Sequence, residues 1–194
     1  MQKKHLPYVV VGLILLVDQA SKLLVKTQMY LGEYHYVLGK YFQLYFIENN
    51  GMAFGYEFAG EYGKLFLTLF RLVAVGFITY YIAQLLKKEE TTKGAIVSLS
   101  LILAGALGNI IDSVFYGVLF GYERLFYGRV VDMLYFPLWE GYMPEWVPFI
   151  GGDYSIFFRH IFNVADMSIS IGVGMLIVFQ KRFFPQEEKV SVSE

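Results

Sequence analysis

Long apolar stretches separated by polar segments dominate the chain. A helix needs about 20 mostly apolar residues to cross the hydrocarbon core of a bilayer. Four stretches of this kind run over residues 6–25, 65–86, 95–115 and 161–179. The first follows two lysines as a signal peptide would, but DQASK at 18–22 is no small-residue cleavage site, so we expect an uncleaved helix. The pattern predicts an all-α integral membrane protein with four transmembrane helices.

Basic residues indicate which side of the membrane each connecting segment faces. They gather before the first span, between the second and third, and after the fourth: Lys3, Lys4, Lys87, Lys88, Lys93, Lys181, Arg182 and Lys189. Such residues are enriched on the cytoplasmic side. We therefore expect both termini, including a polar tail over 186–194, in the cytoplasm. The segments 27–63 and 117–160 then lie outside, and the chain 1–194 forms one membrane-embedded domain.

The two outer segments have structure of their own. Residues 41–48, YFQLYFIE, are rich in aromatic and branched side chains, which predicts a short strand, and NNG at 49–51 predicts a tight turn. The second outer segment contains Trp139, Trp146 and many tyrosines, side chains that favour the headgroup level of a membrane.

Composition narrows the possible functions. The 194 residues are 56% hydrophobic and 17% charged, the net charge is −1, and there is no cysteine. A charge-driven nucleic-acid binder is excluded, and so are disulfides, thiolate metal sites and a cysteine nucleophile. The three histidines form no H-E-x-x-H pair, so a zinc protease is disfavoured, and the sequence contains no P-loop.

Charged residues inside the predicted spans are functional candidates, because charge is costly in hydrocarbon. Asp18 and Lys22 are four residues apart and share a helix face, as a structural ion pair or in a direct role. Arg71 lies near the outer end of the second span, where we expect it to snorkel outward; a carboxylate partner is the alternative.

Three aspartates come together near the outer membrane face. Asp112 ends the third span and Asp166 begins the fourth, each three residues after an asparagine, Asn109 or Asn163, and Asp132 stands among apolar neighbours. Two close carboxylates share a proton, so that one activates water while the other protonates a carbonyl. Besides a peptidase, the cluster suits cation binding, a proton relay, or a network that caps helices.

Five motifs in order along the chain carry a family resemblance. They are DQASK at 18–22, NNGMAFG at 49–55, GALGNIID at 105–112, VVD at 130–132 and FNVAD at 162–166. With four spans of this polarity, the sequence resembles lipoprotein signal peptidase, the type II signal peptidase of bacteria. The resemblance implies an aspartic peptidase of the bacterial cytoplasmic (inner) membrane, with its active site near the outer face, a small β-sheet and a short helix on that surface, and no cofactor.

The resemblance also implies roles for individual residues. Asp132 and Asp166 match the catalytic aspartates. Supporting or substrate-binding positions fall on Asp18, Lys22, Asn49, Gly51, Asn109, Asp112 and Asn163. The implied substrate is a diacylglyceryl-modified prolipoprotein, cut just before the lipidated cysteine. Other implied partners are membrane lipid and the inhibitor globomycin, and the chain is expected to be a monomer.

Two departures from the family pattern stand out. The family usually has an arginine directly after the Asp112 position, where this chain has Ser113. Arg129 is the first candidate to replace it, followed by Arg124, Arg159 and Arg71. The segment between Asp132 and Asn163 is also unusually long, and we expect an extra outer element that contacts lipid, contacts substrate or forms a lid.

The alternatives to a peptidase are a catalytically inactive scaffold of the same fold and a small ion or proton transporter.

Overall fold

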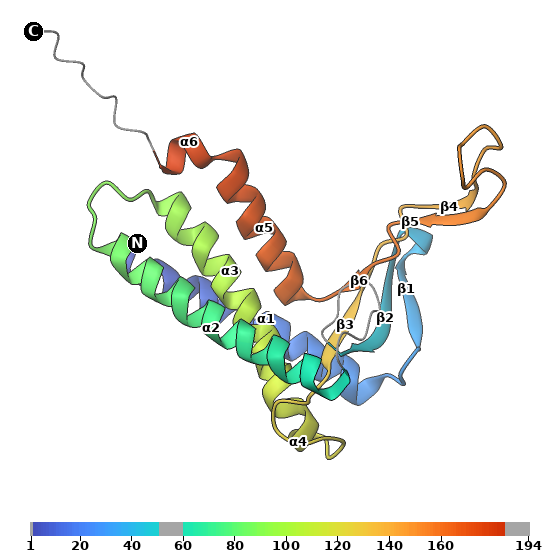
Figure 1. The fold of residues 1–194 in the computed structure, drawn as a ribbon, viewed down its shortest axis with the longest axis horizontal. Helices are drawn as coiled ribbons and strands as arrows, with labels where there is room; N and C mark the ends of the chain where they lie inside the picture. The colour runs from blue at the N-terminus through green and yellow to red at the C-terminus, as the bar shows by residue number, and fades with distance from the viewer. Residues whose placement is uncertain (1, 51–59, 185–194) are drawn as a thin grey trace, which may run out of the picture.

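Helices lie side by side and a small sheet sits at one end of them, in a computed structural model that describes residues 2–50 and 60–184 (Figure 1). The four main helices are α1 (Leu6–Gln28), α2 (Gly60–Leu86), α3 (Lys93–Ile111) and α5 (Val164–Val178). α3 is central, since α1, α2 and α5 all contact it. The short α6 (Gln180–Phe183) lies at the same end as the start of α1 (Figure 1).

Three helices of the described chain are long and apolar enough to cross a membrane, and they correspond to the first three predicted spans. The fourth prediction is wrong at its start. Residues 161–162 form strand β6, and α5 has only 15 residues. The physical reason is Asn163, whose side chain caps the helix and ends the strand before it. α2 begins at Gly60, earlier than the predicted residue 65.

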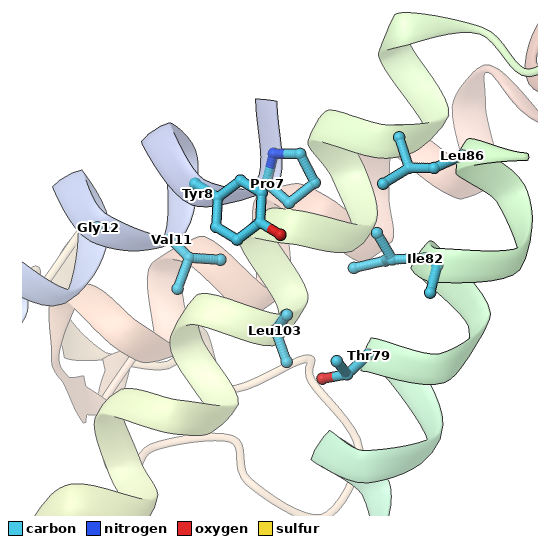
Figure 2. A pocket seen from close by; sticks show the side chains of 9 residues that line it. Pro7, Tyr8, Val11, Gly12, Thr79, Ile82, Leu86 and Leu103 are labelled. Atoms are coloured by element: carbon cyan, nitrogen blue, oxygen red, sulfur yellow. The ribbon is translucent and has the colours of Figure 1, made fainter. Parts of the chain in front are cut away.

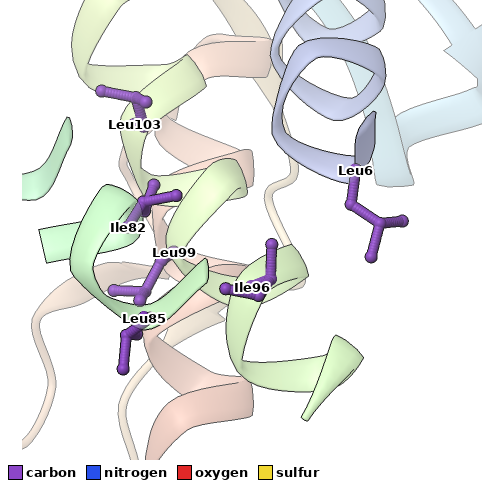
Figure 3. Close-up of a cluster of buried hydrophobic side chains, with 6 residues drawn as sticks. All are labelled: Leu6, Ile82, Leu85, Ile96, Leu99 and Leu103. Carbon is purple, nitrogen blue, oxygen red and sulfur yellow. The ribbon is translucent and has the colours of Figure 1, made fainter. Parts of the chain in front are cut away.

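The bundle core forms where α1, α2 and α3 converge. Its buried side chains are Leu6, Ile82, Leu85, Ile96, Leu99 and Leu103 (Figure 3). Outside this cluster many large apolar side chains of α1 and α2 are exposed, such as Leu16, Phe66 and Val73. Exposed apolar helix faces of this size are typical of surfaces that lipid covers.

The sheet is antiparallel, in the order β1-β2-β3-β6. Its strands are β1 (Tyr34–Leu38), β2 (Phe42–Asn49), β3 (Val130–Tyr135) and β6 (Ile161–Phe162). β2 confirms the strand predicted over 41–48. Its pairing with β3 places Ile47 opposite Asp132 and Asn49 opposite Val130. The sheet therefore brings the end of β2 to the start of β3, which carries one of the candidate aspartates.

The remaining outer elements are short. β4 (Trp139–Tyr142) and β5 (Tyr154–Phe157) pair into a separate hairpin. In the described outer segments the helical turns are limited to the 3-10 turn Gly39–Tyr41 and α4 (Gly117–Leu119), a continuation of α3. The turn predicted at 49–51 falls partly outside the described residues.

A π-helical turn at the end of α3 anchors the loop that leads to β3. The turn covers Asp112–Tyr116, and its wider winding leaves backbone carbonyls free for partners outside the helix. Ser113 O accepts from Gly128 N at 2.9 Å, and Val114 O accepts from Phe126 N at 3.1 Å. A Cβ on Gly128 would lie 2.9 Å from Gly117 N, so only glycine allows this approach. The loop thereby fixes β3 against α3.

Close packing of α3 and α5 depends on glycine, and two glycines of α5 provide a matched test. A Cβ on Gly172 would lie 2.6 Å from Ser98 O and 2.7 Å from Ile102 Cγ1, whereas one on Gly174 would meet nothing within 4 Å. We expect Gly172→Ala to lower the free energy of unfolding by about 1–3 kcal/mol through overpacking. Gly174→Ala should leave it unchanged or raise it slightly. Unfolding of both variants in detergent checks this, and equal effects would contradict it.

Candidate active site

A chain of side-chain hydrogen bonds joins Asp132 on β3 to Asp166 in the first turn of α5. Asn163 donates from Nδ2 to Asp132 Oδ1 at 2.6 Å and to Asn109 Oδ1 at 3.2 Å. Asn109 donates from Nδ2 to Asp166 Oδ1 at 2.7 Å. Two of the predicted supporting asparagines thus link the two predicted catalytic aspartates.

Asn163 has a second role, because it is the N-cap of α5. Its Oδ1 accepts the Asp166 backbone N–H at 2.9 Å. Asp166 therefore lies in the first helical turn, where unpaired N–H groups and the helix dipole favour a negative charge. One residue both orients Asp132 and starts the helix that carries Asp166.

Asn49, at the end of β2, reaches the other oxygen of Asp132. Its Nδ2 donates to Asp132 Oδ2 at 3.2 Å, so both carboxyl oxygens of Asp132 accept a side-chain amide. The role predicted for Asn49 in binding substrate stays a prediction. Gly51, the other predicted residue of that motif, lies outside the described residues.

Burial distinguishes the two carboxyl groups. Asp132 is 1% exposed, whereas Asp166 is half-buried. Burial, assisted by the charge of Asp166, raises the pKa of Asp132 from its ordinary 3.8 to about 7. The amides of Asn49 and Asn163 and the charge of Lys22 oppose this increase without cancelling it. Asp132 therefore keeps its proton up to near-neutral pH.

Beside these carboxyls lies a fully buried ion cluster centred on Lys22. Its Nζ lies 2.9 Å from Asp18 Oδ2, 2.9 Å from Asp112 Oδ2 and 3.0 Å from Asn109 Oδ1, and all three charged side chains are fully buried. An ammonium has three protons to donate, and here each has an acceptor. Of the two roles considered for Asp18 and Lys22, the geometry is that of a structural ion pair, with Asp112 as its third member.

The two carboxylates of this cluster each hold one part of the site. Asp18 Oδ1 accepts Ala165 N at 2.8 Å, and Asp112 Oδ2 accepts Val131 N at 3.2 Å. Ala165 precedes Asp166, and Val131 precedes Asp132. The Lys22 cluster therefore positions the backbone directly before both candidate catalytic aspartates.

Gln19 and Tyr116 complete the cluster, and sequence reasoning assigned a role to neither. Gln19 Nε2 donates to Asp18 Oδ2 at 3.1 Å and to Asp112 Oδ1 at 3.0 Å, and Gln19 Oε1 accepts the Tyr116 hydroxyl at 3.2 Å. The available signal was a glutamine beside Asp18 within an otherwise apolar run.

Among the four candidate arginines, Arg71 alone is placed toward the aspartates. It donates from Nη1 to Ser113 Oγ at 3.2 Å, and its charge interacts with those of Asp166, Asp112 and Asp132. Arg71 was expected to snorkel outward; in the structure it is half-buried, and its guanidinium bonds to a serine on the π-helical turn that follows α3.

The other three arginines have different surroundings. Arg129, the first candidate, pairs with Glu48 at 3.2 Å. Arg124 stacks on Tyr127, and Arg159 is exposed.

The carboxyl pair lies neither in a metal-binding cluster of the described residues nor in the apolar cavity between the helices. Within 2–50 and 60–184, no group of three His, Asp or Glu side chains is placed to hold a metal ion. A cavity of about 360 Å³ lies between α1, α2 and α3, lined by Pro7, Tyr8, Val11, Thr79, Ile82 and Leu103 among others (Figure 2). It contains none of the aspartates, so the candidate site is the carboxyl pair beside the sheet.

The chain is similar to proteins of known family. A family model described as signal peptidase II matches residues 10–182. The lipoprotein signal peptidase of Porphyromonas gingivalis strain ATCC 33277 is 51% identical over 185 residues, covering 88% of this chain and 80% of the relative. That of Amoebophilus asiaticus is 42% identical over 183 residues, covering 90% and 77%.

Solved structures agree at the level of the fold. A bacterial membrane enzyme determined by the in meso method at 1.9 Å resolution matches with a TM-score of 0.61 and 26% identity, covering 90% of this chain and 91% of that one. A second, at 2.3 Å resolution, matches with a TM-score of 0.60 and 24% identity, covering 95% and 93%. The family model and the relatives show that the chain belongs to the signal peptidase II family, the lipoprotein signal peptidases.

Proposed function

We propose that Asp132 and Asp166 are an aspartic catalytic pair that cuts a diacylglyceryl-modified prolipoprotein before its lipidated cysteine. Membership of the family makes the chain a peptidase that removes signal peptides from prolipoproteins. The observation that carries the aspartic assignment is the hydrogen-bond chain Asp132–Asn163–Asn109–Asp166. It holds two carboxyl groups of unequal burial at one place.

The unequal surroundings suggest which group gives a proton and which takes one. Asp166, at a helix N-terminus, is the base: it takes a proton from water as the water oxygen attacks the carbonyl carbon. Asp132 gives its proton to the carbonyl oxygen, and a tetrahedral gem-diol forms. On collapse, Asp166 passes its proton to the leaving amine nitrogen and Asp132 recovers one from a hydroxyl. Each carboxyl ends the cycle as it began.

Arg71 is proposed as the cation that stands where the family arginine is missing. Ser113 Oγ holds the Arg71 guanidinium at 3.2 Å, and Ser113 Oγ itself donates to Asn109 O at 2.8 Å. A guanidinium has five protons to donate, and within the described residues Arg71 uses one. The charge of Arg71 interacts with the carboxyl groups of Asp166 and Asp132, so its other donors are proposed to bind a substrate carbonyl between them.

Loss of this cation is expected to lower the turnover rate. Arg71→Met should reduce kcat about tenfold or more, the loss expected for a hydrogen bond from a charged group. The double variant R71S/S113R places a cation on the π-helical turn after α3, directly after Asp112, and should recover part of the activity. Arg159→Met, at an exposed arginine, is the matched control. Unchanged kcat in Arg71→Met would show that this cation has no part in the reaction.

The membrane arrangement is part of the same proposal. α1, α2, α3 and the shorter α5 cross the bacterial cytoplasmic membrane, with both termini inside and the aspartates near the outer face. Support comes from the basic residues before α1, between α2 and α3 and after α5, and from the position of α6 at the same end of the bundle as the start of α1. A monomer that globomycin inhibits completes the proposal.

A direct test uses the purified chain in liposomes. A diacylglyceryl-modified prolipoprotein is added, and loss of its signal peptide is followed on a gel. The same prolipoprotein without lipid is the matched substrate, which should be cut far more slowly. Absence of cleavage by a folded chain, over several lipidated substrates, would favour an inactive scaffold. Charge movement in liposomes without any lipoprotein would favour a transporter.

The pKa of Asp132 gives a pH dependence with a definite sign. Cleavage should decline as pH rises through about 7, because Asp132 loses the proton it donates. Asn49→Ala removes a donor that favours the ionised form, so the decline should move to higher pH. The pH profiles of kcat for both proteins check this; a shift to lower pH would contradict it.

The free energy of unfolding should also depend on pH through the carboxyl group of Asp132. Since its pKa is raised above the ordinary 3.8, protonated Asp132 contributes stability that is fully present below about pH 4 and is lost as pH rises through about 7.

A further inference from the structure

The β4–β5 hairpin stands apart from the four-stranded sheet. It projects from the end of the bundle at which α5 begins (Figure 1). The connection between its strands is closed by two backbone hydrogen bonds: Met143 N donates to Asp153 O at 2.9 Å, and Gly152 N donates to Met143 O at 3.0 Å. The hairpin is therefore an ordered element, and the catalytic arrangement described above does not use it.

Its exposed side chains are unusually large and apolar. Trp146 is 81% exposed and Phe149 is fully exposed, both in the connection between the strands. Trp139 pairs across the strands with Phe157, and Tyr142 pairs with Tyr154. Because side chains alternate along a strand, the Trp139–Phe157 pair lies on the face opposite to Glu140 and the tyrosine pair. One face thus carries two large apolar rings beside small residues, the other carries Glu140 and Ile156 beside the two tyrosines, and the tip carries Trp146 and Phe149.

Two phenylalanines of the hairpin region have left-handed backbone conformations. Phe149 has φ 69° and Phe158, directly after β5, has φ 68°. A bulky residue in this left-handed region is strained, and such strain is found mostly where a side chain serves binding or catalysis. Here the strain presents an aromatic ring outward from the tip instead of into a protein core.

Charge and residue type identify what covers this surface. Residues 133–158 contain no lysine or arginine, and their charges are limited to Glu140, Glu145 and Asp153, so an anionic partner is disfavoured. Tryptophan and tyrosine beside apolar rings are typical of the boundary between headgroups and acyl chains. The hairpin also joins a bundle in which helices long enough to cross a membrane expose many large apolar side chains.

We propose that the β4–β5 hairpin is a lipid-contacting anchor. Its Trp139–Phe157 face and its tip insert into the headgroup–acyl boundary of the outer leaflet. If the function proposed above holds, the substrate is anchored in that same leaflet by its diacylglyceryl group. The hairpin then fixes the depth of the carboxyl pair relative to the bond that is cut.

The chain offers a direct probe, because Trp139 and Trp146 are its only two tryptophans. All tryptophan emission therefore comes from the hairpin. The whole chain is reconstituted in phosphatidylcholine vesicles, with acyl chains brominated either near the headgroup or near the tail end. Trp139→Phe isolates the emission of Trp146. We expect blue-shifted emission, strong loss with the shallow bromines, weaker loss with the deep ones, and little loss with iodide in the water.

Other outcomes would overturn the proposal. Emission of Trp146 that iodide quenches and neither brominated lipid affects would place the tip in water, free for a protein partner. Lipid quenching that appears only after lipidated prolipoprotein is added would make the hairpin a lid. As a second measurement, Phe149→Asp should shift the emission of Trp146 to the red. The readout needs no turnover, so it succeeds or fails separately from the proposed peptidase activity.

Discussion

Asp132→Asn and Asp166→Asn are each expected to reduce signal-peptide cleavage to background. An asparagine keeps the size of the side chain and most of its hydrogen bonds, but it neither accepts a proton from water nor gives one to a carbonyl. Loss of a general acid or base alone lowers rates by about 100-fold to 10,000-fold. Single-turnover cleavage of a diacylglyceryl-modified prolipoprotein in liposomes measures the effect.

A control of the same chemistry separates catalysis from charge loss. Asp153→Asn, on the exposed hairpin, should cleave as the unaltered chain does. Thermal unfolding of the three variants shows whether the two inactive ones are folded. Cleavage retained by either Asp132→Asn or Asp166→Asn would remove that residue from the mechanism.

Lys22→Met is expected to give the largest loss of stability. The substitution leaves Asp18 and Asp112 buried without their cation. Removing one partner of a buried ion pair costs about 3–5 kcal/mol, because the remaining charge is uncompensated. Reversible unfolding in mixed detergent measures the change, with Lys40→Met at an exposed lysine as the control.

Neutralising the whole cluster tests the reason for that loss. The triple variant D18N/K22M/D112N has no buried charge at this place, and its amide oxygens still accept the N–H groups of Ala165 and Val131. We expect it to be more stable than Lys22→Met alone. If the triple variant is less stable, hydrogen bonding rather than unpaired charge explains the effect.

Elements whose signal is local were predictable from the sequence. Three of the apolar runs became long helices, and the aromatic run at 41–48 became β2. The start of α5 was not predictable from the sequence, because a short apolar segment such as 161–162 suits a strand as well as a helix. Asn163 followed by Asp166 held the information, since an asparagine that accepts the N–H three residues later is an N-cap.

Parts of the site that depend on packing between helices were not predictable in this way. The spacing of Asp18 and Lys22 gave their pairing, but Asp112 joins them only because α1 lies against α3. Arg71 was one of four candidates for the cation missing at Ser113, but on its own helix it was expected to turn toward the membrane surface. Its actual partner, Ser113, lies on the π-helical turn of another helix, which no pattern within residues 65–86 indicates.

The Lys22 cluster has a consequence for how the enzyme is made. Its members come from α1 and α3, and its two carboxylates hold the N–H groups of Val131 on β3 and Ala165 on α5. Asp166 and the N–H of Ala165 both belong to α5, so the arrangement stays incomplete until α5 has packed against α1. The proposed catalytic pair therefore assembles after α1, α3 and β3, and a chain without α5 lacks one of its two carboxyl groups.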